Sequence, residues 1–532
     1  DLMPYLADAV PGWFQATLTL FDAGGRELAY EDDYRFQPDP VLHYQIPSDG
    51  QYVVEINDAL YRGREDFVYR IAIGELPFVT SVFPLGGRAG ARTSVEITGW
   101  NLPSGKSTMD GRRVEPGVYP ISVRSGNLVA SRVPFALDTL SEAFEREPNS
   151  SQKDAQRVNL PVIVNGRVQE PGDWDVFSLQ GRAGDRIVAE VYARRLMSPL
   201  DSVLELTDAG GRRLAFSDDH EDKGFGLITH QADSLLTATL PANGTYYLRL
   251  GDIQRKGGRE YAYRLRISPP RPDFDLRVAP SSVSAAGCAS VPLTVYAARK
   301  DGFEGDIALD LNGAPGGFTL SGGLVPAGQD QVRLTLTVPP TAPKEPVSLR
   351  IEGRAKIQGK TVVRQAVPAE DMMQAFAYRH LVPADDLHVS VVARGSTRIP
   401  SSILTSQPVK IAAGGAVRVR VALPPAYLTF DEIRFELSEP PDGIALRDLS
   451  LDRAGLQAGG RFGAPFGAQP RPGAQFVLQA DAAKIKPGLR GNLIVAISGE
   501  RAPAGNQPTA PVRRRLPVGT LPAIPFEIIT PR

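Results

Sequence analysis

The chain has 532 residues, 59 Lys+Arg against 60 Asp+Glu for a formal charge of -1, and a single cysteine, Cys288. A charge near zero provides no basic field for a phosphate backbone, so the composition excludes a dedicated nucleic-acid binder. One cysteine excludes an internal disulfide, a zinc ribbon and an iron–sulfur cluster. At about 150 residues per domain, the length predicts about three to five domains. No run of about 18 apolar residues occurs, so the sequence predicts no membrane span.

From the N-terminus onward, short segments alternate apolar and polar residues and are separated by turns. Residues 17–20 and 246–250 are examples, and their period of two is typical of strands that are half-buried in a sandwich. The 52 glycines and 46 prolines are an excess that falls between such segments. The sequence therefore predicts an all-β fold of tandem β-sandwich domains.

An internal repeat organises the first half of the chain. Three pairs of segments correspond: 21–33 with 207–219, 50–58 with 244–252, and 67–73 with 261–267. The first pair shares Asp-Ala-Gly-Gly-Arg-x-Leu-Ala and ends in Asp-Asp, and the second copy carries a short insertion before the second pair. Because glycine relieves the strain of a positive φ, the Asp-Ala-Gly-Gly segment predicts a hairpin turn in each copy.

Only the second copy has strand-like segments before the shared part, at residues 160–164, 173–179 and 185–191. Aligning the two copies places Asp1 opposite Ile187, in the middle of a domain. We therefore expect the first copy to lack several strands. A truncated sandwich exposes an unpaired strand edge, so we expect Asp1 to be a processed end or the start of a fragment.

Two other kinds of domain accompany the repeats, one between the two copies and one after the second copy. Residues 77–137 contain two expected strands around a Gly-rich turn and form a small separate β domain. After Pro269-Pro270 the aromatics become sparse, and a loose recurrence of alternating segments predicts two further sandwiches of immunoglobulin-like size. The first covers residues up to 368, and a connector over 369–386 leads to the second.

The repeat motifs carry a family resemblance. Together with Glu147-Pro148-Asn149 and Asp173-Trp174-Asp175 upstream, they resemble the bacterial pre-peptidase C-terminal domain. Residues 77–137 are similar to the TIG type of immunoglobulin-like domain, through Pro-Leu-Gly-Gly and Val-Glu-Ile-Thr-Gly-x-Asn-Leu. The expected domains are a truncated pre-peptidase C-terminal-like sandwich (1–76), a TIG-like domain (77–137), a complete pre-peptidase C-terminal-like sandwich (138–270), an immunoglobulin-like domain (271–368), the connector (369–386) and a second immunoglobulin-like domain (387–532).

This resemblance implies jelly-roll-like sandwiches of secreted bacterial proteins, often attached to proteases. There they help with localisation, secretion or substrate binding rather than with bond cleavage. Some members of the family bind calcium at an acidic N-terminal segment, which implies a Ca²⁺ site in the second copy. The candidate ligands are Glu145, Glu147, Asn149, Asp173 and Asp175.

Calcium chemistry suits these residue types. Calcium takes about six to eight hard oxygen ligands, and alternate residues of an extended segment point to one side, so Glu145, Glu147 and Asn149 can converge. The family pattern has Asp directly after the Asn, whereas this chain has Ser150, which removes one carboxylate. The alternative is a solvated acidic linker beside a pair of aspartates at a strand edge.

The sequence lacks the common catalytic motifs of hydrolases. Neither Gly-x-Ser-x-Gly nor His-Glu-x-x-His occurs, and we expect no enzyme activity and no catalytic residue over this chain. The expected function is that of a secreted or cell-envelope bacterial protein that acts in binding, adhesion or spacing, with an extracellular protein or polysaccharide as its partner. The alternative is the accessory C-terminal region of a secreted peptidase whose catalytic domain lies upstream of residue 1.

Overall fold

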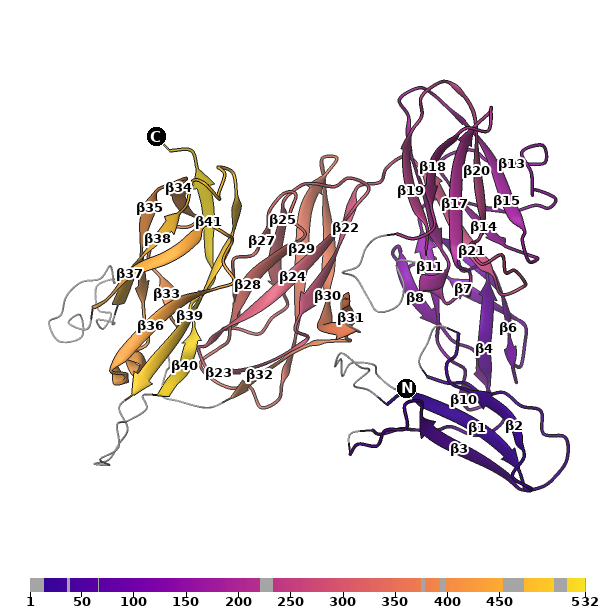
Figure 1. The fold of residues 1–532 in the computed structure, drawn as a ribbon, viewed down its shortest axis with the longest axis horizontal. Helices are drawn as coiled ribbons and strands as arrows, with labels where there is room; N and C mark the ends of the chain where they lie inside the picture. Colours follow the sequence, from indigo (N-terminus) through magenta and orange to yellow (C-terminus); the bar gives the residue numbers. More distant parts are fainter. Residues whose placement is uncertain are drawn as a thin grey trace. The chain divides into compact units, whose positions relative to one another are not determined.

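Two compact units make up the fold of the protein, here a computed structural model (Figure 1). One unit holds residues 1–271 and 372–382, and the other holds 272–371 and 383–532. Nearly all regular structure is β-strand, which confirms the predicted all-β class of tandem sandwiches, and the two short 3-10 turns are η1 (Arg194–Leu196) and η2 (Pro425–Thr429). The structure describes residues 14–35, 39–65, 67–220, 233–374, 378–392, 399–452, 473–501 and 514–531.

The first repeat forms a three-stranded sheet in the order β2-β1-β3. Its strands are β1 (Ala16–Asp22), β2 (Glu27–Glu31) and β3 (Tyr52–Asp58). The β1–β2 hairpin closes on Asp22, whose Oδ1 accepts hydrogen bonds from the amides of Gly24 (2.9 Å) and Arg26 (3.0 Å). Gly25 has a φ of 78°. A positive φ favours glycine at this position, so the predicted hairpin turn is confirmed.

The hairpin turn of the second repeat has the same construction. Asp208 Oδ1 accepts hydrogen bonds from the amides of Gly210 and Arg212, both at 3.0 Å, and Gly211 has a φ of 79°. The sequence identity of the two turns thus reflects one backbone geometry.

The two repeats differ in how far their apolar positions are covered. Tyr69 is 58% exposed and Ile73 is 70% exposed, whereas their counterparts Tyr263 and Ile267 are 0% exposed. The same residue types therefore form a closed core in the second repeat and an open apolar surface in the first.

Residues 77–138 form a small sandwich of two three-stranded sheets and a hairpin. One sheet has the order β4-β6-β7, the other has the order β5-β11-β8, and β9 pairs with β10. Its core is made by Val82, Val95, Ile97 and Phe135. The strands are β4 (Phe78–Phe83), β5 (Gly86–Arg88), β6 (Arg92–Trp100), β7 (Lys106–Asp110), β8 (Gly117–Ile121), β9 (Arg124–Ser125), β10 (Leu128–Val129) and β11 (Val133–Asp138).

The glycine pair of this domain has a role that differs from the predicted turn. β4 and β6 do pair antiparallel, but Gly86 and Gly87 lie in β5, which pairs parallel with β11. A Cβ on Gly86 would lie 2.2 Å from the carbonyl oxygen of Ala136, and a Cβ on Gly87 would lie 2.1 Å from Thr93 Oγ1. Close approach of neighbouring atoms, rather than a positive φ, therefore requires glycine here.

The second repeat is a complete sandwich of two five-stranded sheets. One has the order β12-β14-β21-β16-β19 and the other β13-β15-β20-β17-β18. The extra strands predicted near 160–164, 173–179 and 185–191 are confirmed as β14, β15 and β16. The strands are β12 (Ser141–Phe144), β13 (Gln156–Arg157), β14 (Val162–Arg167), β15 (Trp174–Gly181), β16 (Arg186–Tyr192), β17 (Ser202–Asp208), β18 (Arg213–Ser217), β19 (Leu235–Thr239), β20 (Gly244–Asp252) and β21 (Ala262–Ser268).

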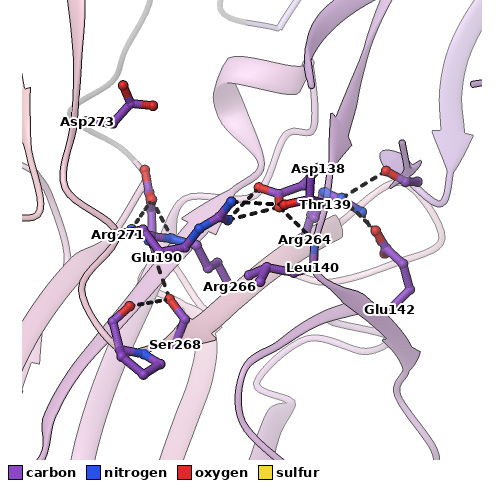
Figure 2. A network of polar contacts seen from close by, with 12 residues as sticks. Asp138, Thr139, Leu140, Glu142, Glu190, Arg264, Arg266, Ser268, Arg271 and Asp273 are labelled. Atoms are coloured by element: carbon purple, nitrogen blue, oxygen red, sulfur yellow. Dashed lines mark hydrogen bonds and ion pairs between the residues drawn. The ribbon is translucent and has the colours of Figure 1, made fainter. Parts of the chain in front are cut away.

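A buried arginine forms an ion pair within the second repeat and a hydrogen bond to the domain before it (Figure 2). Arg264 on β21 is 2% exposed, and its two terminal nitrogens donate to the carboxylate oxygens of Glu142 at 2.7 Å each. The guanidinium also donates to Asn165 Oδ1 (3.2 Å) and to the carbonyl oxygen of Gly87 (3.3 Å). A buried arginine requires such partners, because an unpaired charge is costly away from water. Arg264 therefore fixes the β5 glycines against the second repeat.

Two further arginines extend this network (Figure 2). Arg266 pairs with Glu190 at 2.8 Å, and Arg271 pairs with Asp138 at 2.9 Å. Asp138 ends β11 and Arg271 follows β21, so this pair connects the points at which the chain enters and leaves the second repeat.

In the other unit, residues 273–371 and 383–392 form the next sandwich, and residues 372–382 between them belong to the first unit. Its core includes Phe274, Leu293, Val295 and Leu334. The strands are β22 (Asp273–Ala279), β23 (Ser282–Ala286), β24 (Ser290–Lys300), β25 (Ile307–Asn312), β26 (Thr319–Ser321), β27 (Leu324–Val325), β28 (Gln331–Thr337), β29 (Val347–Ile357), β30 (Lys360–Gln374), β31 (Tyr378–Pro383) and β32 (Leu387–Val392). β32 pairs with β23 and β29. This strand thus completes the sandwich before it, whereas the sequence placed residue 387 at the start of the last domain.

Residues 402–529 form the last sandwich, with Phe435, Phe476 and Phe526 in its core. Its sheets have the orders β33-β35-β38-β37 and β34-β41-β39-β36, and β40 pairs with β39. The strands are β33 (Ser402–Ile403), β34 (Val409–Ala412), β35 (Ala416–Ala422), β36 (Glu432–Ser438), β37 (Ile444–Asp452), β38 (Gly473–Ala480), β39 (Arg490–Arg501), β40 (Arg514–Thr520) and β41 (Ile524–Ile529). Within the described ranges, no helix has the length and apolar character to cross a membrane.

Candidate metal site

The acidic segment 145–149 runs along one end of the second repeat and joins its two sheets. The Glu145 amide donates to the carbonyl oxygen of Asn165 at 3.0 Å, next to β14. The carbonyl oxygen of Asn149 accepts the amide of Val176 at 2.9 Å, on β15 of the other sheet. These backbone bonds position the segment across the end of the sandwich, beside the start of β15.

Three carboxylates converge at this end. Glu147, Asp173 and Asp175 each offer an oxygen that lies within 4.8 Å of the others. Glu147 is exposed, Asp173 is half-buried and Asp175 is buried. Carboxylates this close repel one another unless a proton or a cation lies between them.

Asp175 is the most deeply buried of these three carboxylates. It is 0% exposed, and neither carboxylate oxygen has a hydrogen-bond partner among the residues that the structure describes. Burial, together with the negative charge of Glu145, raises the pKa of Asp175 to about 9. A buried carboxylate without partners is costly when ionised, so this group holds a proton until a cation replaces it.

Asn149 presents a second unpartnered group at the same place. Its side chain is 0% exposed, and within the described part of the chain neither its Oδ1 nor its Nδ2 has a hydrogen-bond partner. Buried polar atoms are normally hydrogen-bonded. An amide oxygen that has no such partner and lies beside three carboxylates is suited to coordinate a cation.

Glu145 lies beside the three carboxylates but has other partners. Its Oε2 accepts hydrogen bonds from the amide of Arg167 (2.9 Å) and the hydroxyl of Tyr263 (2.8 Å), and its Oε1 accepts one from Gln169 Nε2 (3.3 Å). Burial raises the pKa of Glu145. Because both oxygens are already engaged, Glu145 acts on the site through its charge and through the packing around it.

Asp173 and Glu147 are oriented by the backbone. Asp173 Oδ2 accepts the amide of Gln169 at 3.0 Å, and Glu147 Oε2 accepts the amide of Asn149 at 2.9 Å. The backbone therefore holds one oxygen of each carboxylate and directs the second toward the cluster. Ser150, which stands where the family has Asp, contacts Asp173 Oδ1 at 3.5 Å.

Gly166 and Tyr263 support the site and were missed by the sequence. A Cβ on Gly166 would lie 2.1 Å from Glu145 Oε2 and 2.2 Å from the Tyr263 hydroxyl, so only glycine leaves room for their hydrogen bond. No local signal in the sequence indicated the hydrogen bond between Tyr263 and Glu145.

The chemistry of the donor set favours a hard cation. Carboxylate oxygens of Glu147, Asp173 and Asp175 and the amide oxygen of Asn149 can supply four ligands, and the group contains no histidine or cysteine. Oxygen donors of this kind suit calcium, which tolerates flexible geometry and takes water for its remaining positions.

Comparison with known proteins relates part of the chain to a protease. No family model matches the chain. A probable subtilase-type serine protease of Deinococcus radiodurans is 33% identical over 142 residues, which cover 25% of this chain and 18% of that protein. The chain thus spans less than a fifth of the length of this relative.

Proposed function

We propose that this chain belongs to the accessory, non-catalytic region of a secreted subtilase-type peptidase. The observation that carries the proposal is the similarity to the Deinococcus protease, joined to a fold of serial β-sandwiches. The family resemblance of the repeats supports the same conclusion, because pre-peptidase C-terminal-like domains are often attached to proteases. On this proposal the chain works outside the cell or in the envelope, where it aids localisation or substrate binding.

Covalent labelling of active serines in the natural protein tests this proposal. Culture supernatant and envelope fractions of the source cells are treated with a fluorophosphonate that labels active serines, and the protein is captured with an antibody raised against the recombinant chain. We expect the label in the captured polypeptide and none in the recombinant chain itself. A captured polypeptide without label would contradict the peptidase proposal and favour a stand-alone binding protein.

We further propose that the second repeat binds calcium through Glu147, Asn149, Asp173 and Asp175, with Glu145 as a positioning residue. Supporting observations are the three converging carboxylates and the unpartnered, buried side chains of Asn149 and Asp175. Bound calcium would tie segment 145–149 to β15 and stabilise the sandwich end. Calorimetric titration of the chelator-treated chain tests this, and absence of binding at millimolar calcium would refute it.

A further inference from the structure

The sandwich of residues 77–138 is open along one side. β7 is the outer strand of one sheet and β8 is the outer strand of the other, and among the described residues no strand pairs with the free edge of either. A cavity of about 220 Å³ lies between these two edges. Its walls include Ser107, Thr108 and Met109 from β7 and Ile121 from β8.

This cavity reaches the core of the domain. Val82, Val95 and Ile97 line its floor, and they are 3%, 1% and 4% exposed. An apolar hollow in contact with core side chains suits an apolar group, because filling it adds dispersion contacts that the walls lack. The hydroxyl of the exposed Ser107, which pairs with Val95, offers a polar contact beside it.

The surroundings of the cavity are basic. Residues 77–137 contain seven Lys and Arg against three Asp and Glu, whereas the whole chain has a charge of -1. Lys106, Arg124 and Arg132 are exposed, and each adjoins a lining residue in the sequence. The two acids that adjoin lining residues, Glu96 and Asp110, already form ion pairs with arginines.

The two free edges are not equivalent. β8 contains Pro120, which has no amide hydrogen, and proline on an edge strand opposes pairing with another strand. β7 has no proline, so its backbone groups are free to form a ladder with an added strand. An extended segment on β7 would also place alternate side chains toward the cavity.

We propose that the domain 77–138 binds an extended, acidic polypeptide segment, which pairs with the free edge of β7 and places one apolar side chain in the cavity. The observations that carry this are the unpaired β7 edge, the apolar cavity beside it and the excess of unpaired positive charge around its mouth. The inference is independent of the peptidase proposal and of the calcium site.

Selection from a random peptide library displayed on phage, panned on the immobilised full chain, tests this proposal. We expect enrichment of sequences with one aliphatic or aromatic residue flanked by Asp and Glu. On addition of a synthetic enriched peptide, hydrogen exchange at the β7 amides is expected to slow. No enrichment, or enrichment of basic sequences, would overturn the proposal.

Matched variants locate the binding. Ser107→Trp fills the mouth of the cavity, because Ser107 pairs with the buried Val95 and faces the cavity, and it is expected to abolish peptide binding. Ser107→Ala leaves the cavity open and is expected to keep the affinity. Lys106→Glu with Arg124→Glu is expected to weaken binding by about tenfold or more, because it reverses the complementary charge. Arg88→Glu is the control, since β5 lies at the opposite edge of its sheet from β8. Melting curves check that each variant is folded.

Two results would reassign the cavity. If the enriched peptides bind Ser107→Trp as well as the unaltered chain, the cavity is not their site and the proposal fails. If no peptide is enriched but a dansyl-labelled fatty acid binds the chain and is lost in Ser107→Trp, the cavity takes an amphiphile and the polypeptide proposal is overturned.

Discussion

Calcium affinity of the second repeat is predicted to rise steeply with pH. Asp175 has a pKa raised to about 9, chiefly by burial, so it carries a proton at neutral pH in the absence of a cation. Calcium binds the ionised carboxylate and must displace that proton. Below the raised pKa, each fall of one pH unit makes this displacement harder.

The magnitude follows from proton linkage. One displaced proton changes the apparent association constant by about tenfold per pH unit, so we expect about a hundredfold weaker binding at about pH 6 than at about pH 8. Without calcium, the folded state holds a proton that the unfolded carboxyl, with its ordinary pKa of 3.8, has released. Stability of the calcium-free protein therefore falls as the pH rises from about 4 toward about 9, and saturating calcium removes this fall.

Isothermal titration calorimetry in two buffers of different ionisation enthalpy measures both the affinity and the number of protons released. We expect about one proton per calcium ion at neutral pH. Asp175→Asn is expected to weaken calcium binding, to remove its pH dependence and to raise the melting temperature of the calcium-free protein at alkaline pH. Asp185→Asn, at an exposed turn of the same repeat, is the matched control. An affinity that stays constant over this pH range, or binding with no proton released, would refute the reasoning.

Three further substitutions test the packing around the site and the repeats. Gly166→Ala is expected to cost about 1–3 kcal/mol in urea unfolding, because its Cβ overlaps Glu145 and Tyr263; Gly244→Ala, where no atom lies within 4 Å, is the control. Arg264→Leu is expected to cost about 3–5 kcal/mol by leaving Glu142 unpaired, and Glu142→Leu in the same chain should restore much of that loss in thermal unfolding. Asp208→Ala is expected to lower the unfolding midpoint through loss of two turn hydrogen bonds, and an unchanged midpoint would show that the turn forms without them.

Local patterns in the sequence were sufficient to predict strands and turns. Alternation over residues 173–179 predicted β15, and the shared Asp-Ala-Gly-Gly segments predicted both hairpins, because these features depend on neighbouring residues alone. The pairing of β32 with β23 joins segments about a hundred residues apart, its pairing with β29 joins segments about forty residues apart, and no local period records such contacts. The domain division based on composition therefore differed from the observed sheets at this strand.

The sequence was likewise sufficient for the acidic residues of the candidate site but not for the contacts that support them. Its acidic residues were found from spacing and from the family resemblance, and the structure brings Glu147, Asp173 and Asp175 together. The separate position of Glu145 depends on Tyr263, which lies far along the chain, and on the space left by Gly166. Because these contacts join residues far apart in the chain, the sequence alone could not distinguish candidate calcium ligands from the residues that support them.

The ion pair between Asp138 and Arg271 has a consequence for how the protein is assembled from its domains. Since this ion pair joins the residues at which the chain enters and leaves the second repeat, the two ends of that sandwich lie side by side. Domains with neighbouring ends tolerate insertion and removal as a unit. Arg271 and Asp138 thus mark the two points at which this sandwich can be joined to another chain as a single block.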